Sequence, residues 1–413
     1  MRRRGTNWAA ATVAAALFAF SFYVLQRWFE HGSLSDVPLY RHYADLVRGG
    51  AVPYRDFKLE YPPASLPPFL LPAYMSWSYA TSFAVLMGVT GAGCIALVAL
   101  ALRDVDASPA RTWAALLLLG VSPLILGSLF DTRFDLWPTL LAVGALAALV
   151  QERPFVSGGL LGLGFAAKLW PAVLLPIAIA YLWRRRGSDS ALAAVVAFVV
   201  VAAACFLPFA FLAPDGLHAM FTDQLDRPLQ VESLGAAVIM LAHHFGLRPL
   251  TTVSTHGAQA LEGRGAGLAA DLSTALEILA VVATWIGFAR LRRPEAEDVL
   301  LGAAATVCAL VAFDKVLSPQ YLIWLVPFVV LVRGAPGIVA CGLLIAALGL
   351  TQTWFPTHYF TLALDYSSPW SWYLLVRDLA LVALAGVLLF ELSRGRDFGG
   401  RRGDWQAVRR AAA

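Results

Sequence analysis

The most constraining feature of this 413-residue chain is a series of long apolar runs that continues from the N-terminus almost to the C-terminus. Hydrophobic residues make up 59% of the chain and charged residues only 14%, whereas a soluble domain carries roughly 25% charged residues. The mean hydropathy is +0.68. Soluble cores cannot hide so many apolar side chains, so lipid must surround most of the chain. These features exclude a cytosolic enzyme, a secreted domain and a disordered protein.

The apolar runs predict an all-α polytopic membrane protein with about 12 transmembrane helices, because a spanning helix needs about 20 apolar residues and fewer where other helices bury it. The short pair 155–168 and 170–183 can instead form one re-entrant hairpin. The first run follows an arginine-rich start, but no small-residue cleavage site follows Leu25, so we expect an uncleaved span. The predicted segments are residues 7–27, 78–102, 112–130, 134–150, 155–168, 170–183, 190–213, 268–289, 298–313, 319–332, 336–353 and 371–392.

The basic residues predict the orientation of this chain. Most of the 31 lysines and arginines lie in short loops and tails on one side of the predicted topology, and the positive-inside rule assigns that side to the cytoplasm. We therefore expect a plasma-membrane protein with both termini cytoplasmic. Residues 1–392 are predicted to form a single integral membrane domain, followed by a basic cytoplasmic tail at 393–413.

The opposite side carries three long loops, residues 28–77, 214–267 and 354–370, which hold most of the candidate polar residues. A secondary transporter more often places polar residues near the bilayer midplane, in broken helices. The observed distribution favours chemistry at the outer membrane surface. The positions of the basic residues are more informative than the net charge of +4, and no nucleic-acid partner is predicted.

The first long loop begins with a predicted surface helix at residues 36–48. Ser35 is a plausible N-cap, and Pro38 fits the first helical turn. Asp36 lies in that turn, where the helix dipole favours the ionised form, and an ionised carboxylate can accept a proton from a hydroxyl. Tyr40 follows one turn later on the same face. The alternative interpretation is that Asp36 only caps the helix.

The rest of this loop, residues 53–63, combines prolines, tyrosines and charges in a stiff extended segment. Asp56, Glu60 and Tyr61 are its candidate substrate-binding residues, because interleaved charges and tyrosines suit a sugar or a lipid head group. An interfacial aromatic belt is the alternative explanation of the same pattern.

Five segments of the chain, taken in order, resemble glycosyltransferase family 87, the membrane mannosyltransferases of the GT-C class. The first is the loop motif that runs from Asp36 and Tyr40 through Gly50 to Pro63. Four later segments resemble the family in the same order and bring the coverage to residues 36–330. They are Arg133-Phe-Asp-Leu-Trp-Pro138, Lys168-Leu-Trp-Pro171, Arg227-Pro-Leu-Gln-Val-Glu-Ser-Leu234 and Lys315-Val-Leu-Ser-Pro-Gln-Tyr-Leu-Ile-Trp-Leu325.

This resemblance implies a GT-C fold with short surface helices in the extracytoplasmic loops. It also implies a polyprenyl-phosphate sugar donor, usually carrying mannose, and an extracytoplasmic active site with a catalytic aspartate in the first loop. Asp36 is the position that matches this aspartate. The expected partners are the donor, a glycolipid or cell-envelope glycan acceptor and membrane lipids, and the resemblance does not identify the acceptor.

Transfer from a lipid-phosphate donor requires a base for the acceptor hydroxyl and cations for the leaving phosphate. Asp36 can serve as the base of an inverting transfer. The phosphate leaves as an anion and therefore needs positive charge. Lys315, Arg227 and Lys168 are the first candidates for this role, followed by His358. The chain has only three lysines, all in the family-like segments. This suggests that these positions require a compact ammonium group.

Several polar residues have two possible roles at this stage. The candidate substrate-binding residues are Tyr40, Asp56, Glu60, Tyr61, Glu232 and Gln320. Arg133 and Asp135 can form a local ion pair at the end of a span. Glu232 can bind sugar hydroxyls or simply face solvent. His358 can stack on a sugar, contact the phosphate or belong to an aromatic belt.

The sequence predicts no cofactor and no metal site. His243 and His244 lack further ligands nearby, and the absence of an Asp-x-Asp pair leaves dependence on a divalent metal open. The four cysteines lie inside apolar runs, as expected of small buried hydrophobic residues.

Two further functions remain possible from sequence. A transporter or flippase of a lipid-linked sugar would use a similar outward groove but also needs an inward path. The scarcity of polar residues within the spans argues against this, with Glu277 as the main exception. A non-catalytic protein that binds such lipids is the other alternative.

Overall fold

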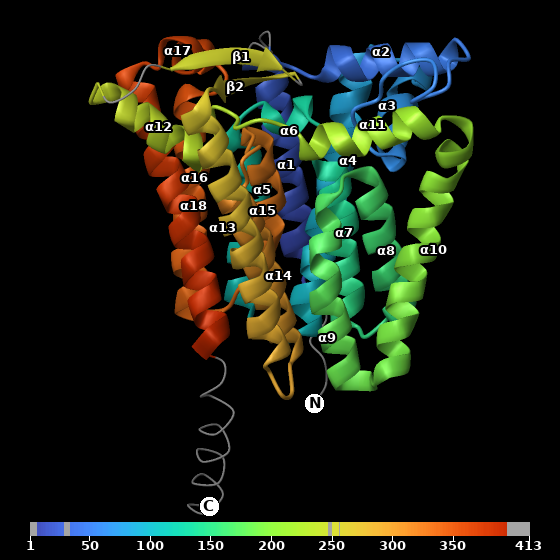
Figure 1. The fold of residues 1–413 in the computed structure, drawn as a ribbon. Coiled ribbons are helices and arrows are strands. Elements are labelled where there is room, and N and C mark those ends of the chain that lie inside the picture. Colours follow the sequence, from blue (N-terminus) through green and yellow to red (C-terminus); the bar gives the residue numbers. More distant parts are fainter. Residues whose placement is uncertain (1–5, 29–33, 247–249, 256, 395–413) are drawn as a thin grey trace, which may run out of the picture.

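The computed structural model describes residues 6–28, 34–246, 250–255 and 257–394, which form a bundle of helices with a β-hairpin at one end (Figure 1). Eight of the described helices are long and apolar enough to cross a membrane, which confirms the predicted all-α polytopic architecture. They are α1 (Trp8–Trp28), α4 (Tyr79–Asp104), α5 (Pro109–Leu126), α10 (Ser188–Leu212), α13 (Arg264–Ala289), α14 (Ala296–Phe313), α16 (Gly334–Trp354) and α18 (Ser368–Arg394).

The remaining four predicted spans form shorter helices of the bundle, so all twelve apolar segments are helical but only eight of them are long enough to cross a membrane unaided. α7 and α15 are almost completely buried and therefore lie inside the bundle. The four short elements are α7 (Leu136–Val150), α8 (Pro154–Ala167), α9 (Leu175–Arg186), which continues the 3₁₀ helix η3 (Trp170–Leu174), and α15 (Leu322–Val329), which continues η4 (Pro319–Tyr321).

Helix length favours the hairpin interpretation of the segment that contains α8 and α9. Helix α8 has 14 residues and is about 21 Å long, and α9 with the preceding η3 has 12 and 5 residues and is about 28 Å long, so both are shorter than the roughly 30 Å of a bilayer's hydrocarbon core. The turn between them at Lys168 and Leu169 lines a pocket. This pair therefore carries a polar residue into the molecule.

The two ends of the bundle differ, as Figure 1 shows. One end, which we call the loop end, gathers the short helices and the hairpin, and the other, the turn end, has short connections. Strands β1 and β2 are antiparallel, with Thr251 opposite Glu262. The loop-end elements are α2 (Val37–Arg48), η1 (Pro63–Ser65), α3 (Leu66–Leu70), η2 (Leu71–Tyr74), α6 (Leu129–Thr132), α11 (Pro214–Leu225), α12 (Leu234–His244), β1 (Thr251–Thr255), β2 (Ala258–Glu262) and α17 (Tyr359–Asp365).

Helix α2 confirms the predicted surface helix and shows why it forms. Asp36 occupies the N-cap position and Pro38 the first turn, where its fixed φ costs nothing. Gly50 ends the helix with φ +91°, a conformation that glycine adopts readily. Tyr40 and Tyr43 are buried, so the helix packs its aromatic face against the bundle.

An aromatic cluster joins the first loop to the start of α7. The ring of Tyr40 stacks on Phe69 at a centroid distance of 4.3 Å, and Phe134 meets the edges of Phe69 and Tyr61 at 5.1 and 4.8 Å. Such contacts stabilise beyond the area they bury. The cluster places Asp36 beside Arg133 although 97 residues separate them in the sequence.

Candidate active site

A cavity of about 720 Å³ lies among the loop-end elements and the helices beneath them. This volume falls within the range of typical small-molecule sites. Its lining comes from the first loop, the α6–α7 connection, the α8–η3 turn, the segment between α11 and α12, the hairpin tip, α13, the α14–η4 connection and α17. The polar lining residues include Asp36, Glu60, Tyr61, Arg133, Lys168, Gln224, Arg227, Gln230, Glu232, Gln259, Glu277, Asp314, Lys315, Ser318, Gln320 and Tyr359.

Asp36 lines this cavity and does not cap α2 with its side chain. Its Oδ1 lies 3.0 Å from Nη1 of Arg133, and its Oδ2 accepts a hydrogen bond of 3.3 Å from the Tyr40 hydroxyl. The side chain keeps 30% of its surface exposed, whereas that of Arg133 keeps 8%. The carboxylate is therefore held in place while remaining open to a ligand.

Burial raises the pKa of the Asp36 carboxyl above its ordinary value of 3.8. The Arg133 guanidinium opposes this effect, Asp135 adds to it, and Lys168 and the Tyr40 hydrogen bond oppose it. The alternative that Asp36 only caps α2 is wrong, because its side chain makes no cap hydrogen bond. Desolvation is the largest influence on its pKa. A raised pKa makes Asp36 a better proton acceptor when it is ionised.

The interpretation of Arg133 and Asp135 as a local ion pair is also wrong. Arg133 pairs with Asp36 and donates to the carbonyl of Leu34. Oδ1 of Asp135 instead accepts from Nζ of Lys168 and from Nε1 of Trp324, each at 2.6 Å. The ion pairs Asp36–Arg133 and Asp135–Lys168 therefore connect the first loop, the start of α7 and the α8–η3 turn.

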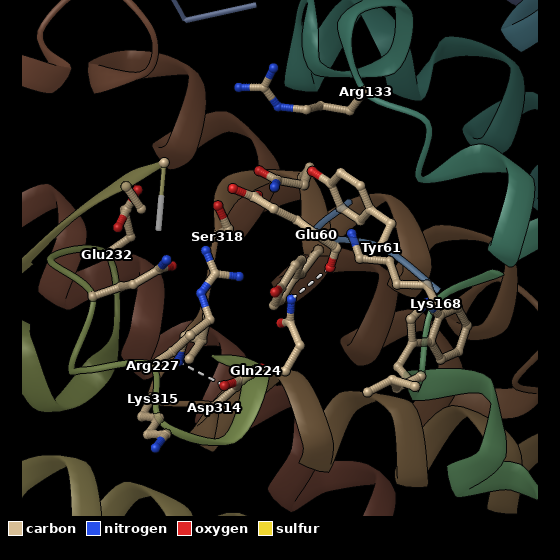
Figure 2. Close-up of a pocket in the computed structure, with 18 of the residues that line it drawn as sticks. Glu60, Tyr61, Arg133, Lys168, Gln224, Arg227, Glu232, Asp314, Lys315 and Ser318 are labelled. Atoms are coloured by element: carbon tan, nitrogen blue, oxygen red, sulfur yellow. Dashed lines mark hydrogen bonds between the residues drawn. The ribbon is translucent and has the colours of Figure 1, made fainter. Parts of the chain in front are cut away.

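Lys168 sits among aromatic rings at the tip of the α8–η3 turn. Its Nζ lies 5.1 Å from the ring centroids of Phe134, Tyr321 and Trp324, which is within cation–π range. Its side chain is 15% exposed and lines the cavity. Figure 2 shows its amine directed toward Tyr61 and Glu60. Asp135 and the rings hold the ammonium, and a ligand can still reach it.

Arg227, Asp314 and Lys315 form a second charged part of the cavity (Figure 2). Burial raises the pKa of Asp314 to about 6, while the Val316 amide and the nearby Arg227 and Lys315 charges oppose this. Lys315 Nζ donates to the Leu225 carbonyl at 2.9 Å and lies at the edge of the group in Figure 2. Glu277 of α13 lines the same cavity, so the exceptional acidic residue noticed within a span belongs to this site.

The remaining predicted substrate-binding residues divide into two groups. Glu60, Tyr61, Glu232 and Gln320 line the cavity. Tyr40 does not line it, since it is fully buried and acts on Asp36 through its hydroxyl.

Asp56 and His358 lie away from the cavity lining. The Asp56 carboxylate binds Arg55 and the Val52 amide at 2.9 and 2.7 Å, which closes a local turn. The ring of His358 stacks on Trp370 at 4.0 Å and 11°. The structure therefore supports a local role for Asp56 and, for His358, an aromatic one in place of contact with a phosphate.

Sequence reasoning missed several lining residues. Gln224 donates to the Glu60 carbonyl at 3.0 Å, and Gln259 and Tyr359 come from the hairpin and α17. No sequence motif indicated that these three residues belong to a site. Arg377 and Asp378 of α18 were also missed, although two adjacent opposite charges in an apolar run are a usable signal.

Among the described residues, no group of three or more His, Cys, Asp or Glu side chains is arranged to hold a metal ion. His243 and His244 are engaged elsewhere: the His243 ring lies 5.4 Å from the Tyr366 ring, and Nε2 of His244 lies 2.7 Å from the Ser371 hydroxyl. We therefore assign no metal ligands in this site.

Comparison with known proteins agrees with this architecture. The model of glycosyltransferase family 87 matches residues 59–319, which include Glu60, Lys168, Arg227, Glu232 and Lys315. Asp36 lies outside the matched range, on the N-terminal side. No curated protein matches the chain. Because the family model covers more than half of the chain, and because the fold is a polytopic helical bundle with a polar cavity, the chain belongs to glycosyltransferase family 87 and is a membrane glycosyltransferase.

Proposed function

We propose that this glycosyltransferase moves a hexosyl group, mannosyl by its family resemblance, from a polyprenyl-phosphate donor to a hydroxyl of a glycolipid or cell-envelope glycan. The observation that carries this proposal is the position of Asp36. Its carboxylate is partly exposed, bound to Arg133, and lines a cavity of about 720 Å³. Three further cations line the same cavity, which suits a donor that carries a phosphate.

The reaction follows from one base and one anionic leaving group. Asp36 accepts the proton of the acceptor hydroxyl, and the hydroxyl oxygen attacks the anomeric carbon of the donor sugar. The bond between that carbon and the phosphate oxygen breaks, and the polyprenyl phosphate leaves with the bonding electrons. A single displacement inverts the anomeric centre. Tyr40 and Arg133 hold the carboxylate in position.

Arg227, Lys168 and Lys315 are the residues that we assign to the donor phosphate. All three line the cavity, and their positive charges stabilise the leaving anion in a partly desolvated site. His358 is left out of this set because it stacks on Trp370. Burial raises the pKa of both Asp314 and Glu232, which reduces the negative charge that the donor meets.

We place the loop end on the extracytoplasmic side of the plasma membrane, with both termini cytoplasmic. The support is the distribution of basic residues, since short arginine-rich connections such as Arg184–Arg186 and Arg290–Arg293 lie at the turn end. The donor lipid tail then lies in the outer part of the bilayer next to the cavity.

A transfer assay tests this function. Purified protein in lipid is incubated with radiolabelled polyprenyl-phosphate mannose and a crude lipid extract. We expect label on a new glycolipid with the native protein and none with Asp36→Asn. Asp45→Asn is the matched control, because Asp45 lies on the same helix but its side chain is 55% exposed and pairs only with surface arginines.

The outcomes of this assay separate the alternatives. Equal transfer by both aspartate variants overturns the role of Asp36. Movement of the donor across the membrane without any transfer identifies a carrier, for which Glu277 of the spanning helix α13 would be the residue to study.

A further inference from the structure

The cavity has one wall whose chemistry differs from that of the cationic sites. This wall is the turn Gln230–Glu232 between Arg227 and α12, together with Gln259 and Tyr359, which line the same cavity. Both Gln230 and Glu232 line the cavity, and the Ser233 amide donates to the Gln230 carbonyl at 3.1 Å, which closes the turn. Val231 between them is completely buried. In Figure 2, Glu232 lies across the cavity from Tyr61 and Lys168.

Backbone hydrogen bonds fix this wall on both sides. The Gln230 amide donates to the Lys315 carbonyl at 2.9 Å, and the Val231 amide donates to the Gln259 carbonyl at 3.1 Å. The Leu261 amide of β2 donates to the Leu229 carbonyl at 2.9 Å. Gln230 therefore forms a single bridge to Ala260 of the hairpin, and these bonds anchor the start of the turn at the cavity.

Two polar atoms of the wall, one on Gln230 and one on Glu232, lack hydrogen-bond partners among the described residues. The exposures of Gln230 and Glu232 are 3% and 2%, and within the described ranges Oε1 of Gln230 and Oε2 of Glu232 accept no hydrogen bond. A buried oxygen without a donor is costly and demands an explanation. Both residues line the cavity, so a ligand in it can supply the missing donors.

A buried ion pair supports the wall from behind. Nη2 of Arg377 in α18 donates to the Glu232 carbonyl at 2.6 Å. Arg377 and Asp378 are both completely buried, and Nε of Arg377 lies 2.9 Å from Oδ1 of Asp378. The guanidinium also lies 5.6 Å from the ring centroid of Trp354. Burying a charge costs free energy, so charged residues within spanning helices are rare and usually paired or functional. Here the Arg377 guanidinium bonds the backbone of Glu232 from the spanning helix α18.

From these observations we infer that the wall formed by Gln230 and Glu232 is a subsite for an uncharged, hydroxyl-bearing sugar ring, and that Arg377 is its positioning residue. Two unpartnered acceptor oxygens require hydrogen-bond donors, which the hydroxyls of a sugar ring supply and a phosphodiester does not. The inference rests on the proposed transferase function and deepens it. The ring can belong to the acceptor or to the donor.

The protonation of Glu232 suits this role. Burial raises its pKa to about 7, with Tyr359, Arg377 and Arg227 opposing the effect. A carboxyl group that is partly protonated near neutral pH both donates and accepts hydrogen bonds, as a sugar hydroxyl requires.

Binding of a sugar without transfer tests the subsite. The full-length protein in detergent is titrated with methyl α-mannoside in the absence of donor, and binding is followed by saturation-transfer NMR. We expect Glu232→Leu and Gln230→Leu each to weaken binding at least about tenfold, because each loses a buried hydrogen bond. Glu232→Gln keeps the hydrogen-bonding capacity and should restore binding to within about threefold of native. Unchanged binding in both leucine variants overturns the subsite.

Gln352→Leu is the matched control. Its Oε1 is also buried without a partner among the described residues, but Gln352 does not line the cavity, so methyl mannoside binding should be unchanged. Inorganic phosphate is the second probe: its affinity should be the same in native protein and Glu232→Leu, and a loss of phosphate binding would overturn the assignment to sugar hydroxyls.

The double variant Arg377→Leu/Asp378→Leu tests the positioning residue. Removing both charges together leaves no unpaired buried charge, so the thermal unfolding temperature should stay close to that of the native protein. Methyl mannoside binding should nevertheless weaken. Unchanged binding overturns the role of Arg377, and a fall in unfolding temperature in step with binding assigns the pair to stability alone.

Kinetic measurements with native protein and Glu232→Leu distinguish the two sources of the ring. A raised KM for the acceptor alone assigns the wall to the acceptor sugar, and a raised KM for the donor alone assigns it to the donor sugar. If native protein transfers but Glu232→Leu keeps both KM values, the subsite is wrong and the transferase function stands. If native protein binds methyl mannoside through the wall yet transfers nothing, the subsite stands and the proposed function fails.

Discussion

At the residue scale, two aspartates of the site hold one cation each but have different access to the cavity. Asp36 pairs with Arg133 and is 30% exposed, whereas Asp135 pairs with Lys168 and is 1% exposed. Only the first can meet an acceptor hydroxyl directly. We therefore assign proton transfer to Asp36 and the positioning of Lys168 to Asp135.

Removing the charge of Arg133 should change the pH dependence of transfer. Arg133 opposes the raised pKa of Asp36, so Arg133→Gln raises that pKa further, by about one unit or more for the loss of an adjacent opposite charge. A base with a higher pKa is ionised only at higher pH. The acidic limb of the kcat/KM profile should therefore move to higher pH, and activity should fall most below neutral pH.

Two variants control this measurement. Arg133→Lys keeps the charge and should leave the acidic limb close to that of the native protein. Arg48→Gln removes a surface arginine of α2 whose side chain is 48% exposed, and it should have no effect. An unmoved acidic limb in Arg133→Gln would contradict the electrostatic role of Arg133.

The Asp135–Lys168 pair should show strong coupling in unfolding experiments. Either Asp135→Asn or Lys168→Met leaves one buried charge without its partner, which destabilises by about 3–5 kcal/mol. The double variant removes both charges, so its loss should be smaller than the sum by at least about 1 kcal/mol. Denaturant unfolding of the four proteins in detergent measures this, and additive losses would argue that the pair does not interact.

At the scale of elements, the position of Lys168 depends on how closely α8 packs on α10. A Cβ added at Gly158 would lie 2.0 Å from the Ala194 carbonyl oxygen, and one at Gly162 would lie 2.4 Å from that of Phe198. These two glycines, four residues apart, let the helix backbones approach closely. The end of α8 then delivers Lys168 to the cavity.

Alanine substitutions should separate the packed face of α8 from its open face. Gly158→Ala should lower the thermal unfolding temperature by several degrees, because the methyl group meets backbone that cannot move aside. At Gly159 an added Cβ would lie 3.6 Å from Val201, an ordinary contact, so Gly159→Ala should be neutral or slightly stabilising. Equal effects at the two positions would contradict the close approach.

Local patterns predicted the elements of this chain better than they predicted the contacts between them. The apolar runs indicated each of the twelve helical segments, and capping and aromatic spacing indicated α2. The pairing of Arg133 with Asp36 was not predictable, because Arg133 and Asp135, which are separated only by Phe134, suggested an ion pair of their own. The sequence also did not predict that Gln224 of α11 and Tyr359 of α17 line the cavity, because only tertiary packing brings these two residues to it.

At the scale of the whole molecule, the two ends of the bundle have separate roles. The hairpin, α2, α11 and α17 contribute to the cavity lining at the loop end, while the turn end has short connections (Figure 1). Chemistry concentrated at one membrane surface fits transfer to an acceptor on that side.

Cysteine labelling should establish the orientation. The four native cysteines are replaced by serine, and a single cysteine is introduced at Thr251 of the loop end or at Arg292 of the turn end, both exposed positions. An impermeant maleimide applied to intact cells should label Thr251→Cys and leave Arg292→Cys unlabelled until the cells are opened. The reverse pattern would place the cavity on the cytoplasmic side.

The most direct test of the central claim measures donor binding and sugar transfer on the same preparation of Asp36→Asn. The substitution keeps the size of the side chain and removes its negative charge, and with it the ability to accept a proton. We predict an affinity for polyprenyl-phosphate mannose within about threefold of native, together with a loss of transfer of about 10³-fold, as expected for removal of a general base. Transfer by Asp36→Asn at a rate close to that of the native protein would contradict the account.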